Sequence, residues 1–283
     1  MHSEPTFLII GAAKSGTTSL CNKLSQHKQV CFSAPKEVKY FSHDENYAKG
    51  LDWYRDHFDI KPEHVAIGEG SVHYSMRSHS PKAVARIKRT LPRVKIVYLV
   101  RHPLDRILSH YRMYERSGNT KFRAFEEDLL SGEYETTLVR PSMYWHQLSA
   151  YRNEFSDKQI HIIFLDSLRN DPQTEIARLC DFLNVERLPP EEATLERLNA
   201  NAQTIRSSPK SRFKRLWKRC FGEKAQKASA DPVGESLWTK RAHQFAVNQL
   251  AEDTSLFLKH CGKPSDYWPM DMVAANERMR VPA

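Results

Sequence analysis

A short glycine-rich segment near the N-terminus carries residue types that bind phosphate or sulfate groups. Residues 11–18 read Gly-Ala-Ala-Lys-Ser-Gly-Thr-Thr and lie between an apolar run and a helical pattern. In that position backbone N–H groups and the positive end of the helix dipole converge on an anion, and Lys14 adds a full charge. The residues predicted to contact the anion are Lys14, Ser15, Gly16, Thr17, Thr18 and Ser19.

This loop differs from the Walker pattern of nucleoside triphosphate enzymes. Gly16 is followed by Thr17, where those enzymes have lysine, and the lysine comes two residues earlier, at Lys14. A Walker-type enzyme also needs a carboxylate after a later strand to hold magnesium. The best such strand, 96–100, is followed instead by Arg-His-Pro at 101–103. The pattern favours a ligand with two separated anionic groups and no metal between them.

Apolar runs that alternate with helical patterns predict the scaffold around this loop. Buried strands are expected at 6–11, 65–69, 94–100 and 160–165. Helices are expected at 17–27, 81–91, 142–155, 172–183 and 237–261, with another that begins at Pro103. Strands that alternate with helices imply a parallel sheet. The predicted fold class is therefore α/β, a P-loop-like parallel sheet flanked by helices on both faces.

The chain is expected to form a single domain over residues 1–283, with its core at about 6–184. The least regular stretches are 118–140 and a loop-rich basic segment at 186–236, followed by a C-terminal helix at about 237–261. Between 206 and 227, nine basic residues face one acidic residue, so this stretch carries +8 of the net charge of +9. Such a run is either a solvated loop or a binding surface for a polyanion.

Composition excludes several classes of protein. The 283 residues are 40% hydrophobic and 27% charged, which is typical of globular chains and not of collagen, coiled-coil rods or disordered proteins. The five cysteines form no C-x-x-C pair, so no disulfide framework and no metal site are predicted. No apolar run is long enough for a membrane span, and an apolar strand begins by residue 6, leaving no room for a signal peptide. A cytoplasmic protein is the expectation.

Two segments together resemble the cofactor motifs of the sulfotransferases, which use 3′-phosphoadenosine 5′-phosphosulfate (PAPS) and release PAP. The first is the loop at 11–20, and the second is the block R-H-P-L-D-R-I-L-S-H-Y at 101–111, which is similar to R-[DH]-P-x-x-R-x-x-S. The resemblance implies that the loop binds the 5′-phosphosulfate group. It also implies that Arg101 and Ser109 bind the 3′-phosphate, and that Lys224 or Lys227 contacts it from a C-terminal loop.

A third segment resembles the heparan-sulfate-type branch and its bacterial relatives. Residues 35–41 and 47–54 are similar to the signatures K-E-x-x-[FY]-F and Y-x-x-G-x-x-W-Y. The resemblance implies sulfuryl transfer to a hydroxyl or amine of a carbohydrate, which could itself be anionic. Glu37 would take the acceptor proton, and Lys14 would stabilise the leaving phosphate.

The chain departs from this branch near the acceptor. Lys39 stands where the 3-O-sulfotransferases usually have histidine, and their E-K-T-P-x-Y stretch reads Glu-Gly-Ser-Val-His-Tyr at 69–74, without the lysine. His73 is therefore an alternative base. Two other functions stay open, a magnesium-dependent nucleotide kinase and, less favoured, a nucleic-acid-binding module that uses the basic run. We expect a carbohydrate partner and no nucleic acid.

Overall fold

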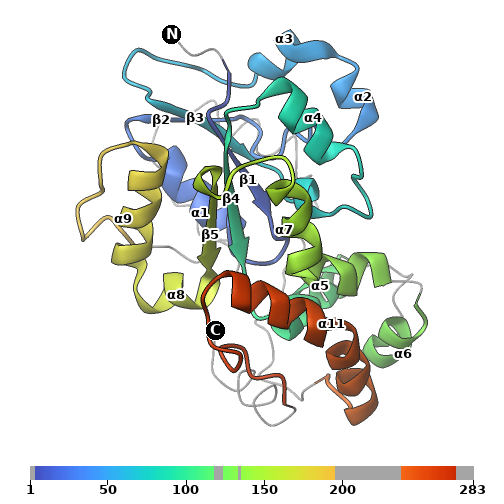
Figure 1. The fold of residues 1–283 in the computed structure, drawn as a ribbon. Helices are drawn as coiled ribbons and strands as arrows, with labels where there is room; N and C mark the ends of the chain where they lie inside the picture. The colour runs from blue at the N-terminus through green and yellow to red at the C-terminus, as the bar shows by residue number, and fades with distance from the viewer. Residues whose placement is uncertain (1–3, 118–123, 133–134, 195–236, 272–283) are drawn as a thin grey trace.

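A computed structural model describes residues 4–117, 124–132, 135–194 and 237–271 of the chain. Its centre is a five-stranded sheet in which every neighbouring pair is parallel, in the order β2-β3-β1-β4-β5 (Figure 1). The strands are β1 (Phe7–Gly11), β2 (Val30–Phe32), β3 (Ala66–Gly70), β4 (Lys95–Val100) and β5 (Ile160–Phe164).

Helices connect the strands, and two of them begin at residues that commonly start helices. Pro103 opens α5 at the first helical turn, and the carboxylate of Asp171 caps α9 by accepting a hydrogen bond from the Thr174 N–H. The longer helices are α1 (Thr17–Ser25), α4 (Ala83–Thr90), α5 (Pro103–Arg116), α7 (Tyr144–Arg152), α9 (Pro172–Leu183) and α11 (Lys240–His260). The shorter ones are α2 (Asp44–Tyr47), α3 (Gly50–Arg55), η1 (Val72–Ser75), α6 (Phe125–Leu130), η2 (Glu135–Val139), η3 (Arg140–Ser142), η4 (Asp157–Gln159) and α8 (Leu165–Asn170).

Alternate side chains of the central strand pack on opposite faces of the sheet. Leu8 and Ile10 belong to a core closed by α4, α7 and α11, whereas Phe7 and Ile9 belong to a core closed by α1 and α9. Figure 1 shows α9 to the left of the sheet and α4 and α7 to its right. Both faces are buried, which explains why the strands read as continuous apolar runs. The predicted fold class is confirmed.

The strand order reverses next to β1. From β1 the chain moves to β2 and β3 on one side, then crosses to β4 and β5 on the other. In open parallel sheets, ligands bind beyond the carboxyl ends of the strands at such a reversal point. The loop after β1 meets the end of β4 there, where the Ala12 N–H donates to the Leu99 carbonyl at 2.6 Å.

Three local predictions need correction. β2 was not expected, because a three-residue strand is too short to show a period. α4 begins at Ala83, two residues after the expected start. The stretch 118–140 contains α6 and η2, whose buried Phe125, Leu129 and Leu138 pack against α5 and α11. Most of the basic segment 186–236 lies outside the described residues. Among the residues that the structure describes, no helix is long and apolar enough to cross a bilayer.

Candidate active site

The loop after β1 adopts backbone conformations that favour glycine at both ends. Gly11 has φ +151°, and a Cβ there would lie 2.1 Å from Ser75 Oγ in η1. Gly16 has φ +90°, and a Cβ there would lie 3.0 Å from a Leu165 methyl group. Lys14 between them also has a positive φ, 69°, which is unfavourable for a residue with a side chain. The loop therefore fits between η1 and α8 and delivers its backbone to the start of α1.

The other residues predicted from this loop all lie at its junction with α1. Gly16 immediately precedes the helix, which begins at Thr17, so their N–H groups belong to its unsatisfied first turn. Ser15 and Thr17 are buried, whereas Thr18 and Ser19 are partly exposed. Free N–H groups at the start of a helix, next to a lysine, are the kind of arrangement to which anions bind in proteins.

Lys14 lies within a group of cations that we call the cationic cluster: Lys14, Arg101, Arg106 and Arg116. Burial and, after it, the positive charges of Arg116, Arg101 and Arg106 together lower the pKa of Lys14 to about 8. Within the described part of the chain, no carboxylate forms an ion pair with Lys14. The loops after β1 and β4 therefore concentrate positive charge at the reversal point of the sheet.

Arg101 is held by its backbone, while its guanidinium is left with few partners. The Tyr144 hydroxyl donates to the Arg101 carbonyl at 2.7 Å. Arg101 lies 3.9 Å from an oxygen of Asp105, and its buried Nε has no hydrogen-bond partner among residues that the structure describes. Ser109 lies on α5 and is partly buried. Lys224 and Lys227, the other predicted contacts, lie outside the described residues.

Arg106 supports the cationic cluster from inside the protein. It is fully buried and donates to Ser142 Oγ and to the Leu138 carbonyl, and it lies 3.0 Å from His110 Nδ1. Burial lowers the pKa of Arg106 to about 10. Burial and the charges of Arg106 and Lys14 also lower the pKa of His110 to about 2, so the ring is neutral. Arg106 therefore contributes fixed charge and anchors α5 below the site.

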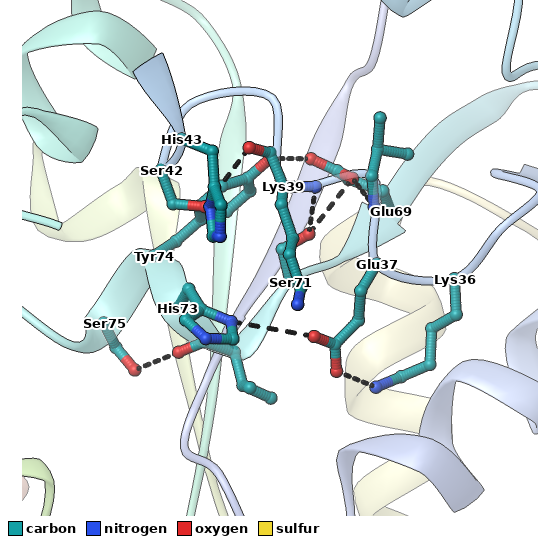
Figure 2. Close-up of polar contacts among 12 residues, drawn as sticks. Lys36, Glu37, Lys39, Ser42, His43, Glu69, Ser71, His73, Tyr74 and Ser75 are labelled. Atoms are coloured by element: carbon teal, nitrogen blue, oxygen red, sulfur yellow. Dashed lines mark hydrogen bonds and ion pairs between the residues drawn. The ribbon is translucent and has the colours of Figure 1, made fainter. Parts of the chain in front are cut away.

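A second group of residues, the carboxylate cluster, comprises Lys36, Glu37, Glu69 and His73. Lys36 Nζ lies 3.1 Å from Glu37 Oε1, and His73 Nδ1 lies 3.8 Å from Glu37 Oε2 (Figure 2). Burial would raise the pKa of Glu37, but His73 and Lys36 outweigh burial and hold it at about 2. Burial would likewise lower the pKa of Lys36, yet the groups around it, Cys21 and the two glutamates, raise it. The Lys36–Glu37 pair is therefore charged throughout the physiological range.

Glu69 is fully buried and positions the segment that carries Glu37. Its carboxylate accepts hydrogen bonds from the hydroxyls of Tyr54 and Tyr74 and from the Val38 N–H, with the Ser71 hydroxyl at 3.3 Å. Burial raises the pKa of Glu69 to about 7, although these hydrogen bonds oppose the rise. Because one of the donors is the residue after Glu37, the end of β3 fixes the place of that side chain.

The two clusters border the same loop. η1, which carries His73, packs against β1 through the close approach of Ser75 to Gly11. On the other side, Cys21 of α1 lies against Gly70, and its thiol is close enough to Lys36 and Glu37 to feel their charges. Burial raises the pKa of Cys21 to about 12, so the thiol is not a nucleophile. The carboxylate cluster thus flanks the anion loop and its helix.

Among the residues that the structure describes, no group of three or more histidine, cysteine or acidic side chains is placed to hold a metal ion.

The sulfotransferase domain family matches residues 4–268. The chain belongs to the sulfotransferase family. It is accordingly an enzyme of the sulfuryl-transfer class.

Relatives of this sulfotransferase include enzymes of heparan sulfate modification. It is 31% identical over 252 residues to mouse heparan sulfate glucosamine 3-O-sulfotransferase 5, covering 85% of this chain and 70% of the relative. It is 32% identical over 200 residues to mouse bifunctional heparan sulfate N-deacetylase/N-sulfotransferase 3, covering 64% of this chain and 22% of the relative. The predicted resemblance to this branch is confirmed.

Solved structures share the fold of this sulfotransferase. A sulfotransferase from Alicyclobacillus acidocaldarius superposes with a TM-score of 0.68 at 22% identity, covering 94% of this chain and 98% of the other. A mouse sulfotransferase, SULT7A1, complexed with PAP, gives a TM-score of 0.57 at 14% identity, covering 92% and 89%. At these identities the likeness shows a common architecture.

Sequence reasoning missed several residues that complete the two clusters. Arg106 is the second arginine of the 101–109 block, so the motif itself carried the signal. Glu69 begins the stretch 69–74 and Lys36 precedes Glu37, but the sequence does not reveal that Glu69 is buried. Arg116 and Tyr144 reach the site from a helix end and a distant helix, and no local pattern marks them.

Proposed function

We propose that this sulfotransferase transfers the sulfuryl group of PAPS to a hydroxyl or amine of a carbohydrate. The observation that carries the proposal is the cationic cluster, in which three arginines act on Lys14 and no carboxylate of the described residues pairs with it. A ligand that carries several negative charges would offset the cost of placing these cations together. The similarity to heparan sulfate sulfotransferases supports a carbohydrate acceptor.

The residues present fit the donor. The buried Nε of Arg101 has no hydrogen-bond partner in the described structure, as expected for a group that awaits a ligand oxygen. The first turn of α1 offers N–H groups beside Lys14. We assign the 5′-phosphosulfate to the loop, from Lys14 to Ser19, and the 3′-phosphate to Arg101 and Ser109. Lys224 and Lys227 remain proposed contacts of that phosphate.

Within this assignment each cluster has a distinct task. When bound, PAPS supplies a sulfuryl group whose transfer leaves negative charge on the 5′-phosphate. Lys14 stands in the loop that receives this charge, and a positioned cation in a water-poor site stabilises it. The backbone of residues 14–17 orients the phosphate for in-line attack. Glu37 and His73 flank the same loop, and this pair receives the proton of the acceptor.

The test is transfer of labelled sulfate from PAPS to purified glycans. We expect label in heparan-type oligosaccharides with the wild-type enzyme and none with Lys14→Ala. Thermal stabilisation by PAP, compared with ATP and magnesium, supplies an independent readout. Stabilisation by ATP and magnesium but not by PAP would favour the kinase alternative and overturn the assignment of the donor. Stabilisation by PAP with labelling of a non-carbohydrate acceptor alone would overturn only the acceptor.

A further inference from the structure

The end of the sheet opposite the two clusters holds a cavity of about 460 Å³. It lies where β1, β3 and β4 begin, since Thr6, Val65 and Arg93 stand just before those strands. Leu183 and Asn184, at the end of α9, line another side. The cationic and carboxylate clusters lie at the carboxyl ends of the strands, so this cavity is separate from the candidate active site.

We propose that this cavity is a second binding site, for an organic anion in which a sulfate, phosphate or carboxylate group is joined to an apolar body. The inference does not depend on the proposed sulfuryl transfer. It follows from two properties of the lining, which combines positive charge that no carboxylate balances with aliphatic side chains.

The polar part of the lining is basic. Its ionisable side chains are Lys61, His64, Arg93 and Lys95. Within the described part of the chain, no carboxylate forms an ion pair with the two lysines or the arginine. Asp59 and Glu63 are close in sequence, but both are exposed and neither lines the cavity. Cations that face one space repel each other, and a bound anion would offset this repulsion.

Two of these basic side chains are held in place by neighbouring groups. The Lys61 N–H donates to His64 Nδ1 at 2.9 Å, so the ring proton lies on Nε2, which is a hydrogen-bond donor. Lys95 Nζ lies 3.1 Å from the Asn184 amide oxygen, in the amide orientation that satisfies both of its polar atoms. Burial lowers the pKa of Lys95, and an anion beside it would favour the charged form. The cavity therefore offers two positioned nitrogen donors besides the exposed Lys61 and Arg93.

The apolar part of the lining would contact the body of the ligand. It includes the buried Ile67 and Leu183 and the partly exposed Ile60. Val65 is 50% exposed, and among the residues that the structure describes only Leu256 is another large exposed hydrophobic residue. Covering such a surface is favourable, and the cavity volume is in the range of small-molecule sites. An inorganic anion would contact only the cations, whereas an organic anion would use both parts of the lining.

The first arm of the test compares simple probes. Hexyl sulfate joins one sulfate group to a short alkyl chain, and inorganic sulfate and 1-hexanol each keep one half of it. In titration calorimetry we expect hexyl sulfate to bind about tenfold or more tightly than either half. The affinity should be the same with excess PAP and in Lys14→Ala, because that lysine lies at the other end of the sheet. N-acetylglucosamine 6-sulfate, titrated in parallel, tests a sugar ring in place of the alkyl chain.

The second arm changes the lining at exposed positions. Lys61→Gln and Arg93→Gln each remove one cation and should weaken the binding of hexyl sulfate by about tenfold. Val65→Asp keeps every cation but adds a carboxylate, and it should abolish binding. Two matched controls should bind as wild type does. Lys82→Gln removes a cation that is paired with Asp44 at 2.8 Å, and Leu256→Asp adds a carboxylate at the other exposed hydrophobic residue.

NMR of the histidine rings locates the ligand. Hexyl sulfate should shift the His64 resonances, and Val65→Asp should remove that shift. If inorganic sulfate bound as tightly as hexyl sulfate, the assigned ligand class would be wrong. Failure of the wild-type protein to bind hexyl sulfate, or undiminished binding by Val65→Asp, would overturn the proposal. If hexyl sulfate binds as expected but PAP does not bind the wild-type protein, only the proposed function fails.

Discussion

The cationic cluster and the carboxylate cluster lie at the same edge of the sheet but differ in how far their charges are paired. In the first, Lys14 and Arg101 are brought together with two further arginines, and no carboxylate of the described residues forms an ion pair with Lys14. In the second, Glu37 is paired with Lys36, and the buried Glu69 is enclosed by hydrogen-bond donors. Charge left unbalanced indicates where an anionic ligand belongs, whereas charge that is already balanced holds reactive groups in place.

If the cationic cluster is completed by the donor, removing its central charge should abolish function without unfolding the protein. We expect Lys14→Ala to reduce kcat by about 10²–10³-fold and to weaken PAP binding in calorimetry. Lys28→Ala removes a lysine that pairs with Glu186 on the exposed surface, and it should change neither quantity. If Lys14→Ala bound PAP as tightly as wild type, the cationic cluster would not be the site of the donor.

The carboxylate cluster should respond in stability as well as in rate. Glu69→Ala leaves two tyrosine hydroxyls and the Val38 N–H without their acceptor, which should cost on the order of 3 kcal/mol in urea unfolding. The exposed neighbour Glu63→Ala is the control and should unfold like wild type. A loss as small as that of Glu63→Ala would show that these hydrogen bonds do not hold the segment.

The raised pKa of Glu69 predicts how the free energy of unfolding changes with pH. The pKa of Glu69 is raised from 4.5 to about 7, so the folded state favours the protonated form. Its contribution to the free energy of unfolding is therefore full below pH 4.5 and is lost as pH rises through 7. Comparing urea unfolding at pH 5.5 and pH 8, we expect a decline in wild type that is absent in Glu69→Gln. An equal decline in both proteins would contradict this.

Lys14 should make donor binding dependent on pH. Because burial and neighbouring arginines lower its pKa to about 8, part of the population is uncharged at that pH, and an anion favours the protonated form. PAP binding should take up a proton near pH 8–9, and affinity should fall by up to about tenfold per pH unit above 8. Calorimetry in buffers of different ionisation enthalpy measures the uptake. Lys14→Arg, which stays charged, should bind without that proton.

Weakening the contacts that hold the backbone of Arg101 should have a smaller effect on stability and PAP binding. Asp253 of α11 caps α7 by accepting from the N–H groups of Trp145 and His146 at 2.9 and 2.7 Å, and α7 begins with the Tyr144 that holds Arg101. Asp253→Ala should lower stability by about 1 kcal/mol and weaken PAP binding slightly. Thermal unfolding with and without PAP tests both, and the exposed neighbour Glu252→Ala is the control.

Local patterns predicted the elements that depend on local chemistry. The apolar runs gave four of the five strands, and Pro103 and Asp171 marked the starts of α5 and α9. The loop after β1 could be singled out as a candidate anion site because its glycines, lysine and hydroxyls are contiguous, as an anion-binding loop requires. β2 and α6 could not, because each is short and is stabilised by contacts with distant parts of the chain.

The order of amino acids by itself determined that a phosphate-type loop follows a buried strand and that a second cationic block follows another, since both properties reside in contiguous residues. The tertiary structure decided that β1 and β4 are neighbours, which brings Lys14 and Arg101 together. It also decided that Glu37, Glu69 and His73 form one cluster. The physical reason is that burial and charge coupling depend on distances in the folded protein. Residues as far apart in the chain as Lys14 and Arg101, or Glu37 and Glu69, come close only when the sheet assembles.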